Sequence, residues 1–142
     1  PDIHVKGDHP LTEHYSVLSP EVTTGPGREP LRQRKESLFQ KPVASAAIYR
    51  KLLDFDAVVI AGQAKSHCVA WTIADLLERA REGDASLVRK IYLLEDCTSP
   101  VVVPGVIDYT DEAERAFGEF ESAGMHVVRS TEPMESWPGM KF

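Results

Sequence analysis

One stretch near the middle of the chain constrains the fold more than any other. Residues 57–61 form a continuous apolar run, which is typical of a β-strand that is buried on both faces of a sheet. Gly62 then supplies a turn, and from Val69 onward apolar residues recur at the spacing of an amphipathic helix. A strand, a short turn and a helix in this order form the unit from which α/β folds with parallel sheets are built.

The helix after this turn has an apolar stripe and recognisable ends. Ser66 is a candidate N-cap, and Gly83 is expected to end the helix. The inward-facing residues are Val69, Ile73, Leu76, Leu77 and Ala80, and the outward-facing ones are Asp75, Glu78, Arg79 and Glu82.

Cys68 is the most informative single residue, because it falls on the first turn of this helix. Helix N–H groups and the positive end of the helix dipole both favour the thiolate, which is the nucleophilic form of cysteine. Open α/β sheets also place their sites at the carboxyl ends of strands. The position therefore indicates an activated cysteine; the alternative is a small buried cysteine that packs like alanine.

The rest of the chain alternates between expected strands and helices. We expect strands at 3–6, 91–94 and 125–129, a helix at 43–53, and a helix at 110–123 that Thr110 caps and Gly124 ends. Residues 97–108 are expected to form a Pro- and Val-rich loop, and the tail from Pro133 is expected to be irregular. This order predicts a three-layer α-β-α fold with a mostly parallel sheet and right-handed crossovers.

The 142 residues are expected to form a single domain, 1–142, with a long loop or arm at 20–38. Gly, Pro, Thr and charged residues dominate that arm, which would serve as a mobile arm, a lid or a subunit contact. The net charge of −6 argues against a nucleic-acid surface. No apolar run is long enough to span a membrane and no signal peptide is recognisable, so we expect a cytosolic protein. The two cysteines do not form a Cys-x-x-Cys pair, so a structural zinc site is not expected.

Two separated segments resemble the isochorismatase-like cysteine hydrolases, and within them the nicotinamidases. The first consists of Lys6-Gly7 and, after a loop, Glu13-His14-Tyr15-Ser16; the second runs from Gly62 to Val69 and continues as Thr72-Ile73-Ala74-Asp75. Asp96-Cys97-Thr98-Ser99-Pro100 and residues 123–128 fall where this family has its later strands. The resemblance implies the C-terminal portion of an isochorismatase-like hydrolase domain, whose N-terminal strand or strands precede Pro1.

The resemblance also implies a catalytic set. Cys68 matches the nucleophile, which would form a thioester, and Lys6 matches the lysine whose ammonium holds the thiolate. The backbone N–H groups of Ala64 and Cys68 match the oxyanion hole, which this family reaches through a cis peptide, here Gln63–Ala64. The alternative for Lys6 is an exposed lysine at the end of a strand.

The family's general-base Asp and its metal-binding Asp-x-His cluster both precede the lysine, and this chain has no residues in those places. We therefore expect an upstream segment or a companion chain to supply the Asp, and residues upstream of Pro1 to hold any divalent, zinc-like metal. No metal ligand is expected on this chain, because His4, His9 and His14 would not converge on one point. The resemblance also makes a homo-oligomer the expected assembly.

Tyr15 and His67 match positions near the substrate pocket, where their rings would flank a pyridine ring. The alternatives are a core tyrosine with a bonded hydroxyl and a solvent-facing histidine. Lys65 would bind a substrate carboxylate or point to water. Cys97 is expected to be a packed thiol, and Asp108 and Asp111 to belong to a turn and a helix N-terminus.

The expected function is that of a cysteine amidohydrolase resembling nicotinamidase, which would convert nicotinamide and water to nicotinate and ammonia in NAD salvage. The first alternative is a hydrolase of the same fold that acts on another amide, a carbamoyl group or an enol ether. The second is a non-catalytic member that binds a ligand or a partner subunit. The rate of thiol labelling discriminates the enzymes from the binding module, because only a catalytic Cys68 should react much faster than Cys97.

Overall fold

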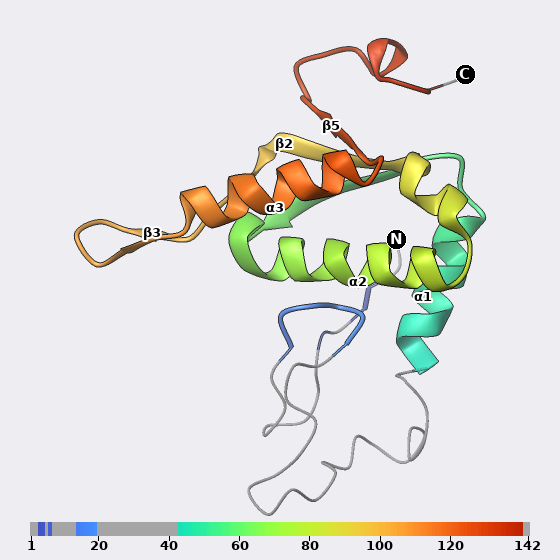
Figure 1. Ribbon diagram of the computed structural model, residues 1–142, viewed down its shortest axis with the longest axis horizontal. Helices are drawn as coiled ribbons and strands as arrows, with labels where there is room; N and C mark the ends of the chain where they lie inside the picture. The colour runs from blue at the N-terminus through green and yellow to red at the C-terminus, as the bar shows by residue number, and fades with distance from the viewer. Residues whose placement is uncertain (1–2, 5, 7–13, 20–42, 141–142) are drawn as a thin grey trace, which may run out of the picture.

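The computed structural model describes residues 3–4, 6, 14–19 and 43–140. The elements in chain order are α1 (Val43–Leu53), β1 (Val58–Gln63), the π-helix η1 (Lys65–Val69), α2 (Ala70–Glu82), the 3-10 helix η2 (Ala85–Lys90), β2 (Ile91–Ser99), β3 (Val102–Val103), β4 (Ile107–Asp108), α3 (Thr110–Ser122), β5 (His126–Val128) and the 3-10 helix η3 (Met134–Ser136). Figure 1 shows α2 and α3 running beside the sheet. This alternation confirms the α/β class.

The main sheet has three strands in the order β1-β2-β5, and both pairings are parallel. A separate antiparallel hairpin, β3–β4, projects from the body of the protein (Figure 1). The mostly parallel sheet that the sequence predicts is therefore confirmed. Because all three strands run the same way, their carboxyl ends meet at one edge. The turn at that edge follows Gln63, so the expectation of a turn at Gly62 is wrong: Gly62 still pairs with Thr98 within β1, just after a shift of register.

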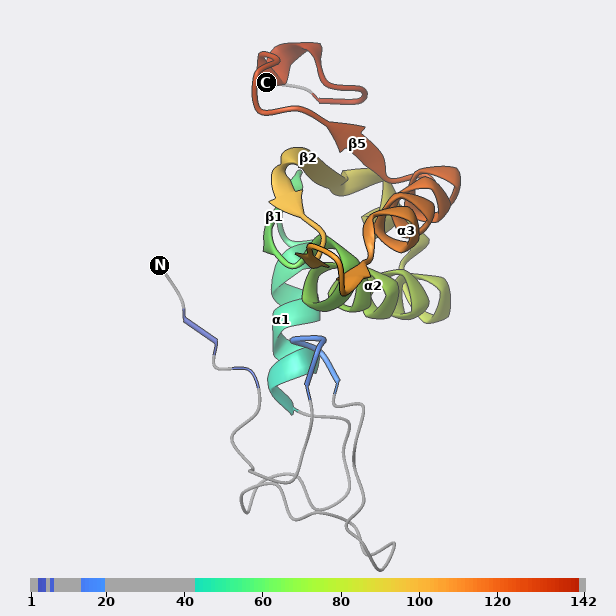
Figure 2. The ribbon, with the colours of Figure 1, turned by 90° about the vertical axis from the view of Figure 1, so that its left-hand side faces the viewer.

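The larger core lies on one face of the sheet. Ile73 of α2 and Ile91 and Leu93 of β2 are fully buried there, together with Phe117 and Phe120 of α3. Helix α1 joins the same core beside the end of α2 (Figure 1), where the Tyr49 hydroxyl donates to the carbonyl of Arg79 at 3.3 Å. Figure 2 shows α1 extending below α2. Periodic apolar residues thus bury α2 as expected, and Gly83 ends it.

The opposite face carries a smaller cluster around Tyr92, Val128 and Trp137. The Tyr92 ring stacks on Trp137 at 5.6 Å between centroids, and its hydroxyl donates to the carbonyl of Pro138 at 2.9 Å. Among the described residues this face is covered by the C-terminal tail rather than by a helix. The tail packs on β2 and β5, so Val59 of β1 remains 42% exposed and the expectation of a strand buried on both faces is wrong there.

Of the strand expected at 3–6, the structure describes Ile3, His4 and Lys6, and none of these three lies in a strand. Ile3 and His4 are irregular, Lys6 lies in a bend, and Ile3 is 88% exposed, because no strand of the described sheet pairs with them. The expected arm at 20–38 lies outside the described residues. No helix in the described part of the chain combines the length and apolar composition needed to cross a membrane.

The expected loop at 97–108 is mostly regular structure. Strand β2 continues to Ser99, and the hairpin follows with a turn at Gly105, whose φ of 73° favours glycine. The valines on both sides of the Pro104-Gly105 pair favour strand, which explains the hairpin. Thr110 is the first residue of α3 and not its cap: the N-cap position is Tyr109, whose side chain makes no capping hydrogen bond, and the Asp108 carboxylate accepts the N–H of Thr110 at 2.8 Å.

Candidate active site

Cys68 lies in the π-helical turn η1, two residues before α2 begins at Ala70. The carbonyl of Ala64 accepts N–H groups from His67 at 3.0 Å and from Val69 at 3.1 Å, and this pair of bonds widens the turn. Ser66 is therefore inside the turn and does not cap it. The Gln63–Ala64 peptide bond is cis, which is the geometry that the resemblance implies.

Lys6 and Cys68 are in direct contact. The Nζ atom of Lys6 donates to the Sγ atom of Cys68 at 3.0 Å and to the carbonyl of Tyr15 at 3.2 Å. Cys68 is half-buried and Lys6 is exposed.

Residues 14–19 are held against α2, which keeps Tyr15 beside η1 (Lys65–Val69), called the nucleophile turn from here on. The Thr72 hydroxyl accepts the N–H of Val17 at 3.2 Å and donates to the carbonyl of Cys68 at 2.7 Å. One turn further along α2, Asp75 accepts the hydroxyl of Ser19. Thr72 and Asp75 therefore connect this segment to the same helix that carries Cys68.

Aromatic rings form a row over the turn. Tyr15 meets His67 edge-on at 5.6 Å between centroids, and His67 meets Tyr109 edge-on at 4.7 Å. Trp71, which is 48% exposed, extends the row from Tyr15 at 6.0 Å. The two residues named from the sequence are thus neighbours, and both are half-buried rather than core or fully solvent-facing.

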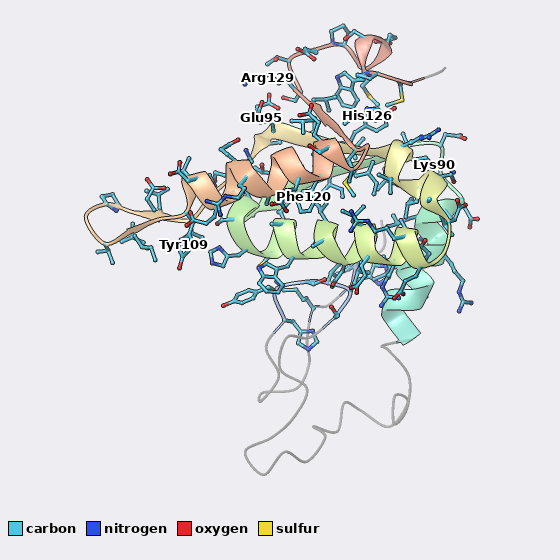
Figure 3. The ribbon with its side chains drawn as sticks, viewed as in Figure 1. Lys90, Glu95, Tyr109, Phe120, His126 and Arg129 are labelled. Atoms are coloured by element: carbon cyan, nitrogen blue, oxygen red, sulfur yellow. The ribbon has the colours of Figure 1, made fainter. Side chains whose placement is uncertain are left out.

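Sequence reasoning missed two members of this row. Trp71 lies three positions after Cys68, and that helical spacing would have indicated it. Tyr109 gives no such signal, because the β3–β4 hairpin and the start of α3 bring it to His67 (Figure 3). The Ser66 hydroxyl supports the same corner: it lies 2.8 Å from His67 Nδ1 and accepts the N–H of Val101 at 3.1 Å.

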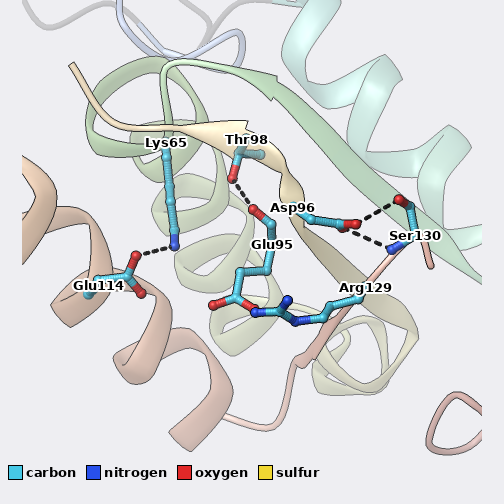
Figure 4. Close-up of polar contacts among 7 residues, drawn as sticks. All are labelled: Lys65, Glu95, Asp96, Thr98, Glu114, Arg129 and Ser130. Carbon is cyan, nitrogen blue, oxygen red and sulfur yellow. Dashed lines mark hydrogen bonds and ion pairs between the residues drawn. The ribbon is translucent and has the colours of Figure 1, made fainter. Parts of the chain in front are cut away.

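Lys65 fits neither of the roles that the sequence left open. Its side chain is only 3% exposed, so it neither points to water nor reaches a substrate carboxylate from the surface. Its Nζ atom lies 2.6 Å from Oε1 of Glu114 and 4.4 Å from the centroid of the Phe117 ring (Figure 4). A buried ammonium requires such a partner, since leaving it unpaired away from water is costly.

The carboxyl ends of β2 and β5 carry a polar set near the turn (Figure 4). Asp96 accepts the N–H of Ser130 at 2.9 Å and its hydroxyl at 2.7 Å, and these two bonds hold the pKa of Asp96 below its usual value. Glu95 pairs with Arg129 at 3.0 Å. Cys97 directly follows these two acids and is exposed rather than packed, in the stretch where the register of β2 against β1 shifts.

The described residues contain no group of three His, Cys, Asp or Glu side chains that could hold a metal ion. His4 and His14 are described, whereas His9 is outside the described residues. Within residues 3–4, 6, 14–19 and 43–140, the structure therefore provides no ligand set for the divalent metal that the resemblance implies.

No protein-family model matches this chain, and no curated protein matches it. A search of solved structures finds similarity to an Acinetobacter baumanii nicotinamidase/pyrazinamidase, with 18% sequence identity and a TM-score of 0.46. The similarity covers 84% of this chain and 43% of that one, so the chain spans less than half the length of the solved structure.

Proposed function

We propose that this chain carries the nucleophile of a cysteine amidohydrolase of the isochorismatase-like type. The observation that carries the proposal is the 3.0 Å contact between Lys6 Nζ and Cys68 Sγ, beside a turn with a cis peptide at Gln63–Ala64. A cation in contact with a partly exposed thiol is the arrangement expected of a reactive cysteine, and a structural cysteine does not need it.

In this proposal the Cys68 thiolate attacks a carboxamide carbon, so that a carbon–sulfur bond forms and the carbonyl oxygen takes the negative charge. The backbone N–H groups of Ala64 and Cys68 stabilise that oxygen, and each such donor typically lowers the barrier by about 2.7–4 kcal/mol. Collapse of the intermediate breaks the carbon–nitrogen bond, and the nitrogen takes up a proton and leaves as ammonia. Water then attacks the thioester, which releases the carboxylic acid and regenerates the thiolate.

The proton transfers require a general base beyond the residues discussed so far. We assign it to an Asp on a segment upstream of Pro1 or on a companion chain, and a homo-oligomer is one source of such a chain. A divalent, zinc-like metal would be held by the same upstream segment. Both cysteines are free, which suits the reducing cytosol that we propose as the location.

We propose nicotinamide as the substrate, with nicotinate and ammonia as products and NAD salvage as the setting. The rings of Tyr15 and His67 contact each other, His67 directly precedes Cys68 in the chain, and a planar pyridine ring would pack against the two rings. The exposed indole of Trp71 extends the same apolar surface.

The experiment uses the full-length protein and follows nicotinate and ammonia in equal amounts. Cys68→Ala should abolish turnover and Cys97→Ala should leave it unchanged; equal turnover in Cys68→Ala would overturn the proposed mechanism. Fast alkylation of Cys68 without nicotinamide turnover would instead indicate another amide, a carbamoyl group or an enol ether as substrate. Slow alkylation at both cysteines would indicate a non-catalytic binding member of the fold.

A further inference from the structure

The charged side chain of Lys65 lies beneath the nucleophile turn, away from any substrate. Lys65 is the first residue of η1 and directly follows the cis peptide bond, yet its side chain is 3% exposed. Its ammonium meets one carboxylate oxygen of Glu114 at 2.6 Å and the face of the Phe117 ring at 4.4 Å, and both partners belong to α3. An ion pair therefore joins the nucleophile turn to α3 (Figure 4).

The two side chains of this ion pair differ in their exposure to water. The Glu114 side chain is 54% exposed, whereas that of Lys65 is almost entirely buried. Water can therefore solvate the carboxylate if the lysine is removed, but it cannot solvate the ammonium if the glutamate is removed unless the turn moves. Removal of the carboxylate should therefore displace the turn. Removal of the lysine should displace α3 less.

A second contact joins the same two elements on the outside. Tyr109, which precedes α3, places its ring against His67 of the turn at 4.7 Å. Helix α3 thus contacts the turn at Lys65, and the residue before α3 contacts it at His67. Ala64 and Cys68, whose backbone N–H groups are the proposed donors, directly precede Lys65 and directly follow His67, respectively, in the chain.

We propose that Lys65, held by Glu114, is a positioning residue that fixes the backbone donors of the nucleophile turn. This inference rests on the proposed function for its kinetic consequence, but the geometry it asserts is independent of the reaction. The Lys65 ammonium is buried against Glu114 and Phe117, whereas the lysine that contacts the Cys68 thiol is Lys6. Displacement of a reacting group by about 1 Å can cost about 100-fold in rate, so a small movement of the turn matters.

The direct test is amide hydrogen exchange over residues 64–69 in the full chain. Glu114→Ala should raise exchange there by about tenfold or more, because the unpaired ammonium forces the turn to open. Lys65→Met keeps the length of the side chain and removes its charge, so it should raise exchange less. The double variant should exchange more slowly than Glu114→Ala alone, because it no longer contains a buried unpaired charge.

Glu119→Ala is the matched control, since it removes an exposed acid from the same helix and should leave residues 64–69 unchanged. Glu114→Gln keeps an acceptor oxygen for Lys65. If Glu114→Ala does not fold, the exchange measurement is made on Glu114→Gln and Lys65→Met instead. Unchanged exchange at residues 64–69 in both Glu114→Gln and Lys65→Met would overturn the inference. A double variant that exchanges faster than Glu114→Ala would also overturn it.

The kinetic test separates this inference from the proposed function. If wild type hydrolyses an amide, Glu114→Ala should lower kcat by about tenfold or more and leave KM nearly unchanged, because oxyanion donors act mainly in the transition state. If wild type hydrolyses none, the proposed function fails and the exchange measurement still decides the role of Lys65. If Glu114→Ala raises exchange at residues 64–69 but leaves kcat normal, then Lys65 does not act on catalysis through the backbone donors.

Discussion

Lys6 Nζ lies 3.0 Å from Cys68 Sγ, although 62 positions of sequence separate the two residues. The contact depends on how residues 14–19 pack against α2, since Lys6 also donates to the carbonyl of Tyr15. Thr72 belongs to α2 and bonds both to Val17 and to the Cys68 carbonyl. The approach of the cation to the sulfur is therefore a property of the tertiary structure.

Replacing Lys6 by Met should slow alkylation of Cys68 by about tenfold, because the attacking sulfur loses the cation that contacts it at 3.0 Å. The rate is measured by mass spectrometry of the Cys68 peptide after treatment with iodoacetamide. Cys97 is exposed in the same molecule and provides an internal control whose rate should not change. An unaltered Cys68 rate in this variant would show that the lysine does not activate the thiol.

Thr72→Val should loosen residues 14–19 and lower the free energy of unfolding by about 1–3 kcal/mol, because it removes two hydrogen bonds at a partly buried site. Urea denaturation gives the stability. Alkylation of Cys68 should also slow, since Lys6 loses its neighbour at Tyr15. Thr131→Val, at an exposed position, is the control and should change neither quantity; if Thr72→Val behaves like it, the segment does not depend on Thr72.

Tyr109→Ala should raise KM for nicotinamide about two- to tenfold, because His67 loses a ring contact of the kind that contributes about 0.5–1.5 kcal/mol. Tyr109→Phe keeps the ring and should behave like wild type. The measurement is initial rate against substrate concentration. A rise in KM in the Phe variant as large as in the Ala variant would assign the effect to the hydroxyl instead.

Ile73→Ala should lower the free energy of unfolding by about 2–5 kcal/mol, because the side chain is 0% exposed in the larger core and its removal leaves a cavity. Val106→Ala removes apolar atoms from a residue that is 79% exposed, and it should change stability by less than about 0.5 kcal/mol. Chemical denaturation of both variants gives the comparison. Equal losses would mean that the hairpin valine is covered in solution.

The pKa of Asp96 is lowered by the N–H and the hydroxyl of Ser130, which fixes the sign of a pH effect. A lowered folded-state pKa gives stability that is present above the unfolded value of 3.8 and is lost as pH falls through the folded value. Ser130→Ala removes the hydroxyl donor, so its stability should fall less than that of wild type between about pH 6 and about pH 3. Urea midpoints at the two pH values test this, and identical changes in both proteins would contradict it.

Local pattern was sufficient for several elements. The apolar stripe through Ile73 predicts α2, the run at 57–61 predicts β1, and glycines predict the ends of α2 and α3. These features depend on the period of side chains along a helix or strand and on backbone freedom at glycine, and both are properties of neighbouring residues. The cis bond at Gln63–Ala64 was expected only through the resemblance to a family.

The sequence by itself determined the α/β alternation, the parallel sheet and the position of a cysteine just beyond the carboxyl end of a strand. Only the tertiary structure decided that Lys65 is buried against Glu114, that Tyr109 meets His67, and that Cys97 is exposed. The physical reason is that burial and ion pairing depend on which distant elements pack together. A lysine reads as a surface residue until a carboxylate from another helix is placed within reach of its ammonium.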